Sequence, residues 1–477
     1  MLHHCAVTIW LKAKLHQFIA LSLAILLLTG CGSRPLATPQ PTHVVVIPTV
    51  TLPQPTHTAA PSATPTAKLT KPSSPEPTVK VAEPSPPTAT VAPTITPRRE
   101  EPDPTPTLQE ATPNPPTPTP TQAPRPRPLR MKSPEYGMQA FLWWRPEVAT
   151  RDLGLIEDAG FGWVKQNFGW RDIELAKGQF DWSHSDFIVK FTEDAGLDLL
   201  VRVDFQPEWA GGGYPTNGPP DNYQDFGDFL AALAARYKSR IRAYQIWNEP
   251  NLARDWGGRP PNPAEYVALL KVAYQRIKAV DPQAMVISAG LSPTTRWDNI
   301  AMPDVEFLRG MYQAGARPWF DVLGVHATGW KAHPEADPAV VARDPSLYNP
   351  GDIATVPEQL RRVYCFRHVE DLREIMIQYG EGDKQVAVLE FGWTTDLIHP
   401  EYSWFAVTQE QQADYLVRAY QYAKEHWSPW IGLMCLIYIS DHDWTEQNEQ
   451  YWWAITWPGY PEPVLRPAYK ALEAMPK

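Results

Sequence analysis

The feature that most constrains the fold is a regular alternation of short apolar runs and longer amphipathic stretches after residue 131. The apolar runs have the length of buried strands and occupy 138–144, 163–168, 197–205, 243–247, 284–291, 322–327, 385–391 and 432–439. Between them lie stretches with helical periodicity, such as 222–236 and 264–280. Eight strands alternating with helices in one segment, 131–477, predict an α/β fold of the (β/α)8 TIM-barrel type.

The runner-up fold is an open, doubly wound parallel sheet. Such a sheet usually carries a glycine-rich phosphate loop after its first strand, whereas Trp-Trp-Arg-Pro at 143–146 has no glycine. The barrel is therefore favoured. In a barrel, functional side chains gather at the carboxyl ends of the strands, so polar residues that follow apolar strands are the candidates for chemistry.

The chain before this segment has a different composition. Residues 31–130 hold 27 of the 53 prolines and none of the 20 tryptophans. A tract of this kind cannot bury enough apolar surface to offset its ordering entropy. We expect a disordered Pro/Thr-rich linker over 31–130, which extends as polyproline II and tethers a folded domain at 131–477.

The N-terminal segment has the pattern of an export signal. Lys12 and Lys14 precede an apolar run at 18–28, which is too short for a comfortable membrane-spanning helix. The run ends in Leu-Thr-Gly-Cys at 28–31, which resembles the bacterial lipoprotein signal. The resemblance implies that 1–30 is removed, that Cys31 is lipidated, and that the protein is anchored at the outer face of the cell membrane or at the cell surface. The alternative is an ordinary secretory signal.

Charge and cysteine content narrow the possible partners. Residues 131–477 carry 47 acidic and 32 basic residues, which disfavours a nucleic-acid partner because phosphates require a basic face. No cysteine and histidine cluster has zinc spacing, and we expect neither a metal nor an organic cofactor. Beyond the signal region, Cys365 and Cys435 remain; Cys435 lies in an apolar run and is expected to be buried.

Two apolar strands end in a glutamate. The fourth strand is followed by Asn248-Glu249, and the seventh ends at Glu390. A carboxylate at the rim of a barrel is partly desolvated and destabilising unless it is paired or used. Two carboxylates that face one cleft are what glycoside hydrolysis needs, because one protonates the leaving oxygen and the other attacks or activates water.

With these residues in view, the chain resembles the clan A glycoside hydrolases. The resemblance covers about 135–475 and rests on Trp-Asn-Glu-Pro-Asn at 247–251 and on the second strand-terminal glutamate. Residues 170–174 and 178–182 are similar to the stretch after the second strand of that clan. The resemblance implies a retaining (β/α)8 enzyme, with family 39 as the first choice within the clan and family 5 as the second.

The resemblance assigns roles residue by residue. It implies that Glu249 is the acid/base, that Glu390 is the nucleophile, and that Asn248 binds the 2-hydroxyl group of the sugar. A retaining enzyme needs its two carboxyl groups about 5 Å apart. We also expect a raised pKa at Glu249, since a general acid must be protonated near neutral pH, and an ionised Glu390 with donors beside it.

Three charged or titratable residues on predicted strands are further candidates for the site. Clan members commonly place an arginine near the nucleophile, and here Lys165 stands at that position. Arg202 either supplies the missing cation to Glu390 or pairs with Asp204. His326 ends the sixth strand, where it is either a structural group or a contact to the nucleophile or the sugar.

Aromatic residues at strand ends are candidate sugar platforms, since the apolar face of a sugar packs on a ring while its hydroxyls reach polar groups. Tyr438 and Trp444 follow the eighth strand, where clan relatives commonly stack on the sugar. Trp209 and Trp393 are the preferred candidates among the tryptophans that follow other strands. The alternative for each is an ordinary core position.

The sequence thus predicts a surface-tethered retaining glycosidase that acts as a monomer on a polysaccharide or oligosaccharide. An alternative from another class is a non-catalytic carbohydrate-binding lipoprotein on the same barrel. Transglycosylation shares the site with hydrolysis, and the sugar, the linkage and the choice between endo and exo cleavage stay open. A long loop at 329–360 after the sixth strand is expected to close one end of the cleft.

Overall fold

The structure is a computed structural model that describes residues 129–211, 217–353 and 355–477. The predicted signal peptide at 1–30, Cys31 and the predicted linker up to residue 128 lie outside the described residues. Among the described residues, no helix is both long and apolar enough to span a membrane.

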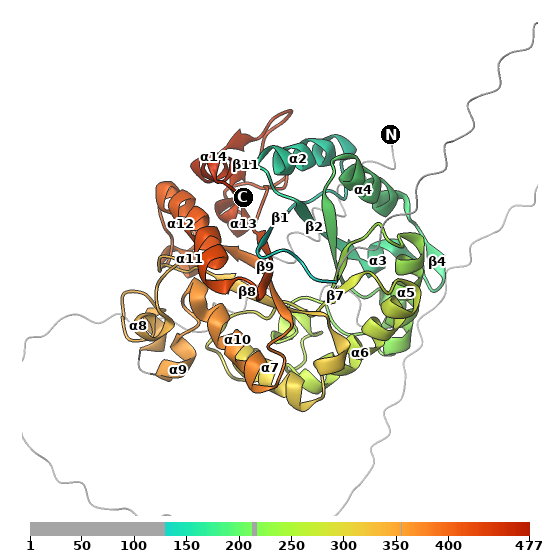
Figure 1. Cartoon of the computed structure of the whole chain (residues 1–477), viewed down its shortest axis with the longest axis horizontal. Coiled ribbons are helices and arrows are strands. Elements are labelled where there is room, and N and C mark those ends of the chain that lie inside the picture. The colour runs from blue at the N-terminus through green and yellow to red at the C-terminus, as the bar shows by residue number, and fades with distance from the viewer. Residues whose placement is uncertain (1–128, 212–216, 354) are drawn as a thin grey trace, which may run out of the picture. The chain divides into compact units, whose positions relative to one another are not determined.

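Within these residues, eight parallel strands close into a barrel (Figure 1). Around the barrel they follow one another in chain order, because each strand pairs with the one before it and the last pairs with the first. They are β1 (Glu135–Gln139), β2 (Trp163–Gly169), β5 (Asp198–Asp204), β6 (Ala243–Ile246), β7 (Met285–Ile287), β8 (Val322–Thr328), β9 (Gln385–Gly392) and β10 (Ile431–Leu436). The predicted (β/α)8 barrel is therefore confirmed.

Seven of the predicted strands coincide with observed ones, and the first is displaced. The prediction placed it at 138–144, whereas β1 spans Glu135–Gln139. Residues after β1 are nevertheless apolar because the fold buries them: Leu142 is fully buried, and its backbone N–H donates to the side chain of Gln166 at 2.7 Å. A loop that turns into the core has the same apolar signature as a strand.

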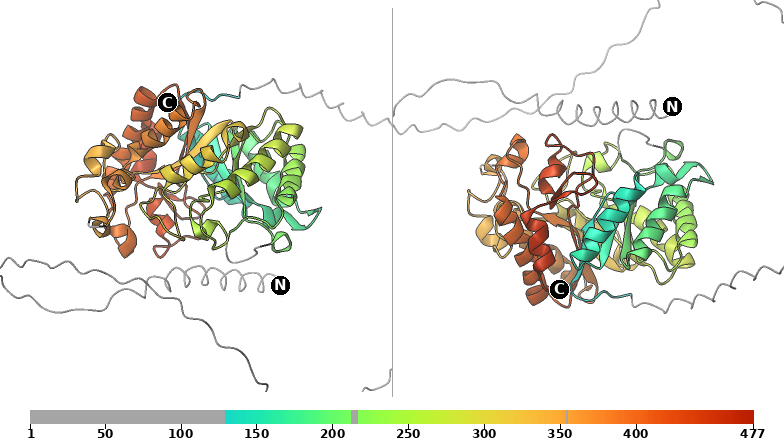
Figure 2. Two further views of the ribbon diagram at one scale, coloured as in Figure 1. Left: turned by 90° about the horizontal axis from the view of Figure 1, so that it is seen from below. Right: turned by 90° about the horizontal axis from the view of Figure 1, so that it is seen from above.

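Helices cover the outside of the barrel (Figure 2). The main ones are α2 (Pro146–Asp158), α4 (Ser183–Asp194), α5 (Tyr223–Arg236), α6 (Pro263–Val280), α7 (Asp304–Gln313), α10 (Val369–Gln378), α12 (Gln409–Tyr422) and α14 (Pro467–Ala474). Both predicted helices are confirmed. Asn222 and Asn262 explain where they start, because each side chain accepts from backbone N–H groups in the first turn of its helix.

Shorter elements decorate the loops of the described chain. They are α3 (Trp170–Ile173), β3 (Glu174–Ala176), β4 (Gln179–Phe180), η1 (Glu208–Ala210), η2 (Ala253–Asp255), η3 (Arg317–Trp319), α8 (Pro338–Val341), η4 (Pro350–Asp352), α9 (Glu358–Arg361), η5 (Phe366–His368), α11 (Pro400–Ser403), η6 (Ala423–Trp427), α13 (Glu449–Trp453), β11 (Thr456–Trp457) and β12 (Val464–Leu465). The predicted long loop after β8 contains α8, η4 and α9. Residues of this loop pack with Tyr364 and Cys365, which follow it, in a small buried cluster.

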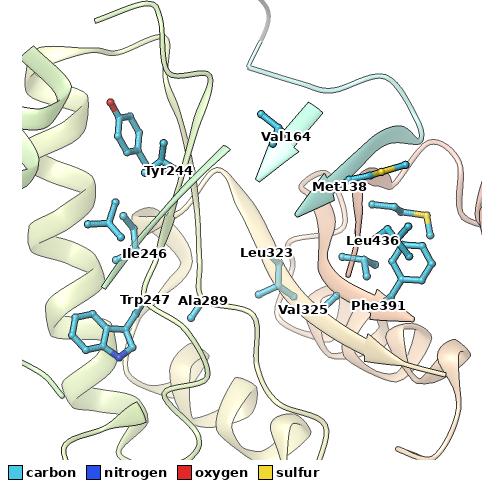
Figure 3. Close-up of a cluster of buried hydrophobic side chains, with 14 of the residues drawn as sticks. Met138, Val164, Tyr244, Ile246, Trp247, Ala289, Leu323, Val325, Phe391 and Leu436 are labelled. Atoms are coloured by element: carbon cyan, nitrogen blue, oxygen red, sulfur yellow. The ribbon is translucent and has the colours of Figure 1, made fainter. Parts of the chain in front are cut away.

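Alternate strand residues form two apolar layers, as the period of two requires. Outward residues such as Tyr244, Ile246 and Val325 pack between the barrel and the helices (Figure 3). Inward residues such as Leu200 and Ala243 fill the barrel itself. Cys365 and Cys435 are both buried free thiols, which confirms the expected burial of Cys435.

One strand breaks this alternation. On β9, Val388 and Phe391 both belong to the outer layer and Leu389 to the inner one, while the pairing with β8 shifts register just before Glu390. The pairing with β10 shifts over the same stretch. A bulge of this kind inserts one residue and re-aims its neighbours. As a result Leu389 and Glu390 both face inward, and Glu390 lies inside β9 rather than beyond its end.

Candidate active site

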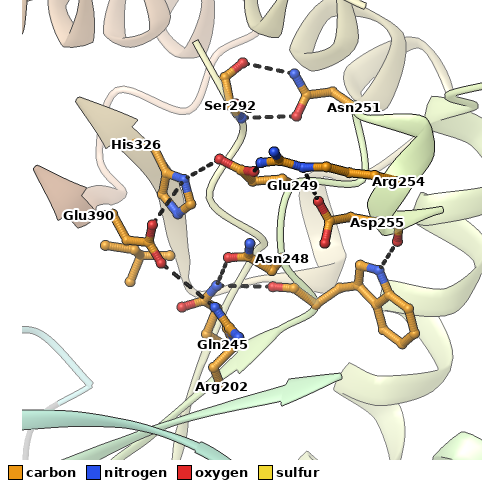
Figure 4. Close-up of polar contacts among 12 residues, drawn as sticks. Arg202, Gln245, Asn248, Glu249, Asn251, Arg254, Asp255, Ser292, His326 and Glu390 are labelled. Atoms are coloured by element: carbon orange, nitrogen blue, oxygen red, sulfur yellow. Dashed lines mark hydrogen bonds and ion pairs between the residues drawn. The ribbon is translucent and has the colours of Figure 1, made fainter. Parts of the chain in front are cut away.

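Five polar side chains from five different strands or strand ends converge at the carboxyl end of the barrel. They are Lys165 on β2, Arg202 on β5, Glu249 just after β6, His326 on β8 and Glu390 on β9. Figure 4 shows Arg202, Glu249, His326 and Glu390 of this group. All five were selected from the sequence, and the structure brings all of them together. Lys165, Arg202 and His326 each occupy an inward position of the alternation, which directs them into the mouth of the barrel.

Two cations lie beside Glu390. The Lys165 Nζ donates to Glu390 Oε1 at 2.9 Å and to the Leu389 carbonyl at 3.1 Å, and its side chain is 1% exposed. Arg202 Nη1 lies 3.7 Å from the same oxygen, while Arg202 Nε lies 3.1 Å from Asp204. The lysine therefore makes the contact expected of an arginine, and both alternatives for Arg202 hold at once.

Glu249 is positioned by an unusual backbone turn. Trp247 and Glu249 both have positive φ, 71° and 40°, a backbone conformation that residues other than glycine rarely adopt. The turn is held by the Glu249 N–H, which donates to the Gly290 carbonyl at 3.1 Å, and by the buried Trp247 ring, which donates to the Asp255 carbonyl at 2.8 Å. These contacts tie the end of β6 to its neighbours and fix the direction of the Glu249 carboxylate.

His326 lies between the two glutamates. Its Nδ1 is 3.0 Å from Glu249 Oε1 and 3.8 Å from Glu390 Oε2. Because both oxygens are close to one nitrogen, their separation is below about 7 Å, a range that includes the roughly 5 Å of retaining glycosidases. The buried imidazole thus acts as a spacer that fixes one carboxylate relative to the other.

The electrostatics favour ionised carboxylates in this arrangement. Burial by itself raises the pKa of Glu390, but Lys165, His326 and Arg202 outweigh it, so the net direction is downward. The same holds at Glu249, where burial is outweighed by His326 and Arg254 and the pKa is lowered. The lowered pKa of Glu390 fits an ionised nucleophile, whereas the raised pKa that was expected at Glu249 is not found here.

Amides around Glu249 hold the rest of the motif. The Gln245 amide donates to Asn248 Oδ1 at 3.3 Å, which orients the Asn248 side chain beside the glutamate. Asn251 donates to the carbonyls of Ser292 and Met302 and accepts from the Ser292 N–H. Asn251 therefore fastens the motif to the loop after β7, a structural role, while Asn248 is left partly exposed at the site.

Two of the predicted aromatic platforms lie beside the site. Tyr438 follows β10, and burial followed by the charge of Glu390 raises its pKa well above the usual range. The rings of Tyr438 and Trp444 pack edge to face with centroids 5.2 Å apart, and both contact Phe141. Trp444 is partly exposed. The loop after β10 thus presents aromatic surface next to Glu390.

The two preferred tryptophans differ in their burial. Trp393 is fully buried, donates to the Ala332 carbonyl at 2.9 Å and packs against Phe366 and Tyr415. A ring enclosed in this way cannot stack on a sugar, so Trp393 is corrected to a core residue. Trp209 packs edge to face with Trp170 and donates to the Glu174 carbonyl at 3.0 Å, while its ring stays partly exposed, so its role as a sugar platform stays a prediction.

The sequence analysis missed one residue that contacts a candidate catalytic group. Arg254 in η2 donates through Nη2 to Glu249 Oε2 at 2.6 Å and through Nε to Asp255 at 3.1 Å. Its side chain is 73% exposed. No pattern in the sequence marks an arginine in a polar loop as a partner of a catalytic group. The contact of Arg254 with Glu249 depends on the shape of the turn between them.

Comparisons with known proteins address the class of this barrel. Residues 129–351 match the family model described as cellulase (glycosyl hydrolase family 5). A relative, endo-1,4-beta-xylanase 3 of Hypocrea jecorina, is 24% identical over 106 residues, which are 21% of this chain and 28% of the xylanase. The chain therefore spans less than a third of that relative.

Solved structures share the fold at low identity. A family 39 glycoside hydrolase from the gut symbiont Bacteroides cellulosilyticus WH2 aligns with a TM-score of 0.52 and 19% identity, over 73% of this chain and 64% of that chain. A glucosidase from Croceicoccus marinus aligns with a TM-score of 0.50 and 13% identity, over 72% and 67% of the two chains. These alignments support a common barrel.

The structure confirms the predicted TIM barrel. The match of residues 129–351 to the family 5 cellulase model supports the predicted class, a clan A glycoside hydrolase. Of the two families predicted within the clan, family 5 is the one whose model matches the chain, and a family 39 structure shares its fold.

Proposed function

We propose that this protein is an extracellular, membrane-tethered retaining glycoside hydrolase that cleaves β-glycosidic bonds of a polysaccharide or oligosaccharide. Glu390 is the nucleophile and Glu249 is the acid/base. The observation that carries the proposal is the pair of carboxylates beside one imidazole nitrogen, at 3.0 and 3.8 Å, in the mouth of a barrel whose residues 129–351 match a cellulase family model.

The proposed reaction has two displacements. Glu390 attacks the anomeric carbon while Glu249 donates a proton to the departing glycosidic oxygen, which leaves a glycosyl ester on Glu390. Glu249 then removes a proton from water, and the water oxygen displaces the Glu390 carboxylate with overall retention. Lys165 and Arg202 support the first step, because they hold Glu390 ionised and can stabilise the carboxylate again when it leaves.

The proposed substrates are β-linked plant or microbial glycans. Xylan is the first polymer to test because the similar relative is named an endo-1,4-beta-xylanase, and β-glucans are next because the matching family is described as cellulase. Mannan and galactan complete the screen. The size distribution of the products distinguishes endo from exo cleavage, and added acceptor sugars reveal transglycosylation.

The decisive test uses aryl β-glycosides and the Glu390→Ala variant. Wild type is expected to release the aryl group and to give the β-anomer as first product, which proton NMR detects before mutarotation. Loss of turnover in Glu390→Ala, with an unchanged melting temperature, supports the assignment. If wild type binds the glycans but turns none over, the protein is a carbohydrate-binding lipoprotein and the proposal fails.

The membrane tether rests on the sequence at 28–31. Expression with a labelled fatty acid is expected to give a lipid-labelled protein in the membrane fraction. The Cys31→Ser variant is expected to lose the label and to become a secreted protein. Equal labelling of the two proteins would refute the anchor without bearing on the glycosidase.

A further inference from the structure

Both oxygens of the Glu249 carboxylate are occupied. His326 lies 3.0 Å from Oε1, and Arg254 donates to Oε2 at 2.6 Å. To act as an acid, a carboxyl group must present a proton to the glycosidic oxygen from one of these two positions. Both partners hold the carboxylate ionised, so the withdrawal of one of them favours the protonated acid that the proposed reaction needs.

Exposure decides which partner can withdraw. The His326 side chain is 3% exposed and lies against Gly290, where not even a methyl group would fit beside the ring. The Arg254 side chain is 73% exposed. An exposed side chain changes rotamer at little cost, whereas a buried ring in a packed barrel cannot. Arg254 is therefore the partner that can leave, and Oε2 is the oxygen that its departure uncovers.

Arg254 has other partners available when it leaves Glu249. Its Nε already lies 3.1 Å from Asp255 Oδ2 (Figure 4), and its charge also acts on the Glu449 carboxyl group. Asp255 is fixed because its carbonyl accepts from the buried Trp247 ring. The guanidinium can therefore pivot about its bond to Asp255 without losing every ionic partner.

We propose that Arg254 is a positioning residue that covers the acid/base carboxylate of the free enzyme and is displaced towards Asp255 by the leaving-group sugar. The inference rests on the proposed function, since it assigns Arg254 a part in the use of Glu249 as an acid. Displacement removes a positive charge from Oε2, and Glu249 then takes up a proton from solvent. Proton uptake is in this way coupled to substrate entry.

The charges that face Glu249 set the direction of the expected effect. Arg254 and His326 lower its pKa, while burial, Glu390 and Asp255 oppose ionisation. Removal of Arg254 deletes an attractive charge and leaves the opposing groups in place. The pKa of Glu249 must then rise, and the protonated fraction at neutral pH rises about tenfold for each unit.

The first test needs no turnover. Carbon-13 NMR of labelled glutamate carboxyls gives the pKa of Glu249, assigned as the signal that the Glu249→Gln variant lacks. We expect Arg254→Ala to raise that pKa by one unit or more. Arg343→Ala is the matched control, since Arg343 is 68% exposed and pairs with Glu358 in the loop after β8. An unchanged Glu249 signal in Arg254→Ala, or an equal shift in the control, overturns the proposal.

The second test compares two leaving groups in the full-length enzyme. An alkyl or sugar leaving group needs protonation, whereas a dinitrophenyl group leaves without it. We expect Arg254→Ala to move the alkaline limb of kcat/KM to higher pH for the first substrate only, with Arg254→Lys intermediate. Identical alkaline limbs in wild type and Arg254→Ala overturn the proposal. If wild type turns over neither substrate, the proposed function fails, while the NMR titration still decides the role of Arg254.

Discussion

The two carboxylates of the site are held by different kinds of neighbours. Glu390 lies within β9, and its cations, Lys165 and Arg202, are side chains of barrel strands that are buried or nearly so. Glu249 lies on a turn after β6, and one of its two partners, Arg254, is largely exposed. The Glu390 carboxylate is therefore surrounded by cations that cannot move, whereas the Glu249 carboxylate is covered by an arginine that can.

This difference matches what the two roles require. A nucleophile must be ionised and fixed near the anomeric carbon, so permanent cations in a packed barrel serve it. An acid/base must gain and lose a proton in each cycle, so at least one of its partners has to be removable. If this is correct, fixed charges control the pKa of Glu390 and a removable charge controls the pKa of Glu249.

The largest effect is expected from removing either carboxylate. Glu390→Ala should reduce kcat for aryl β-glycosides by about a thousandfold or more, because the covalent intermediate cannot form. Glu249→Ala should lose about 10²- to 10⁴-fold on substrates with poor leaving groups and much less on activated ones. Initial rates with a series of phenols of different acidity measure both.

Azide distinguishes the two roles by product stereochemistry. In Glu390→Ala the anion replaces the nucleophile and displaces the aryl group once, which gives an inverted α-glycosyl azide. In Glu249→Ala the anion attacks the glycosyl ester on Glu390, which gives a β-glycosyl azide. NMR of the isolated products decides the matter, and the opposite pair of anomers would exchange the two assignments.

The next effect concerns the fixed cations. Lys165 is the largest of the three charges that together lower the pKa of Glu390 against burial, so removal of the lysine should raise that pKa and activity should be lost at a higher pH as the pH falls. Lys165→Met is expected to lower kcat by about a hundredfold and to move the acidic limb of kcat/KM to higher pH. The pH profile from pH 4 to 8 provides the measurement.

Arg202→Met serves as the graded comparison, because Arg202 lies 3.7 Å from Glu390 Oε1 whereas Lys165 lies 2.9 Å away. Its acidic limb should move less than that of Lys165→Met. An acidic limb that stays in place in both variants would contradict the view that these cations keep the nucleophile ionised.

A smaller effect is expected from displacing His326, the spacer between the two glutamates. A methyl group at Gly290 would collide with the His326 ring. Gly290→Ala should therefore shift the imidazole, disturb the spacing of the two glutamates and lower kcat/KM by about tenfold. Steady-state kinetics with a thermal melt measure activity and stability separately.

Gly154→Ala is the matched control, because Gly154 lies in α2 with open space where the methyl group would go. It should keep full activity and melt slightly higher, since alanine favours a helix. Full activity in Gly290→Ala would show that His326 tolerates displacement and is not a spacer.

Much of this site follows from strand positions that the sequence reveals. The alternation of inward and outward residues places Lys165, Arg202 and His326 in the mouth of the barrel once β2, β5 and β8 are located, and the motif at 247–251 locates Glu249. Such positions are predictable because the period of a strand is fixed by backbone geometry.

Other features depend on packing that no local pattern encodes. A regular β9 with Leu389 inward would turn Glu390 outward, and only the bulge brings it to the site. The burial of Trp393 depends on Phe366 and Tyr415, which come from distant parts of the chain. The contact of Arg254 with Glu249 depends on a turn with two positive φ values.

The smallest effect is expected at the aromatic surface beside Glu390. Trp444 is partly exposed and its ring packs on Tyr438 and Phe141, so truncation removes surface for the sugar without opening the barrel core. Trp444→Ala should raise KM by about three- to tenfold, the equivalent of a single aromatic contact, and leave kcat and the melting temperature nearly unchanged. Trp393→Ala is the opposite case, because it creates a cavity in the core and should lower the melting temperature before it affects KM. If Trp444→Ala lowers kcat as strongly as it raises KM, the ring positions the reacting carboxylate, and the rigid surroundings of Glu390 then include the loop after β10.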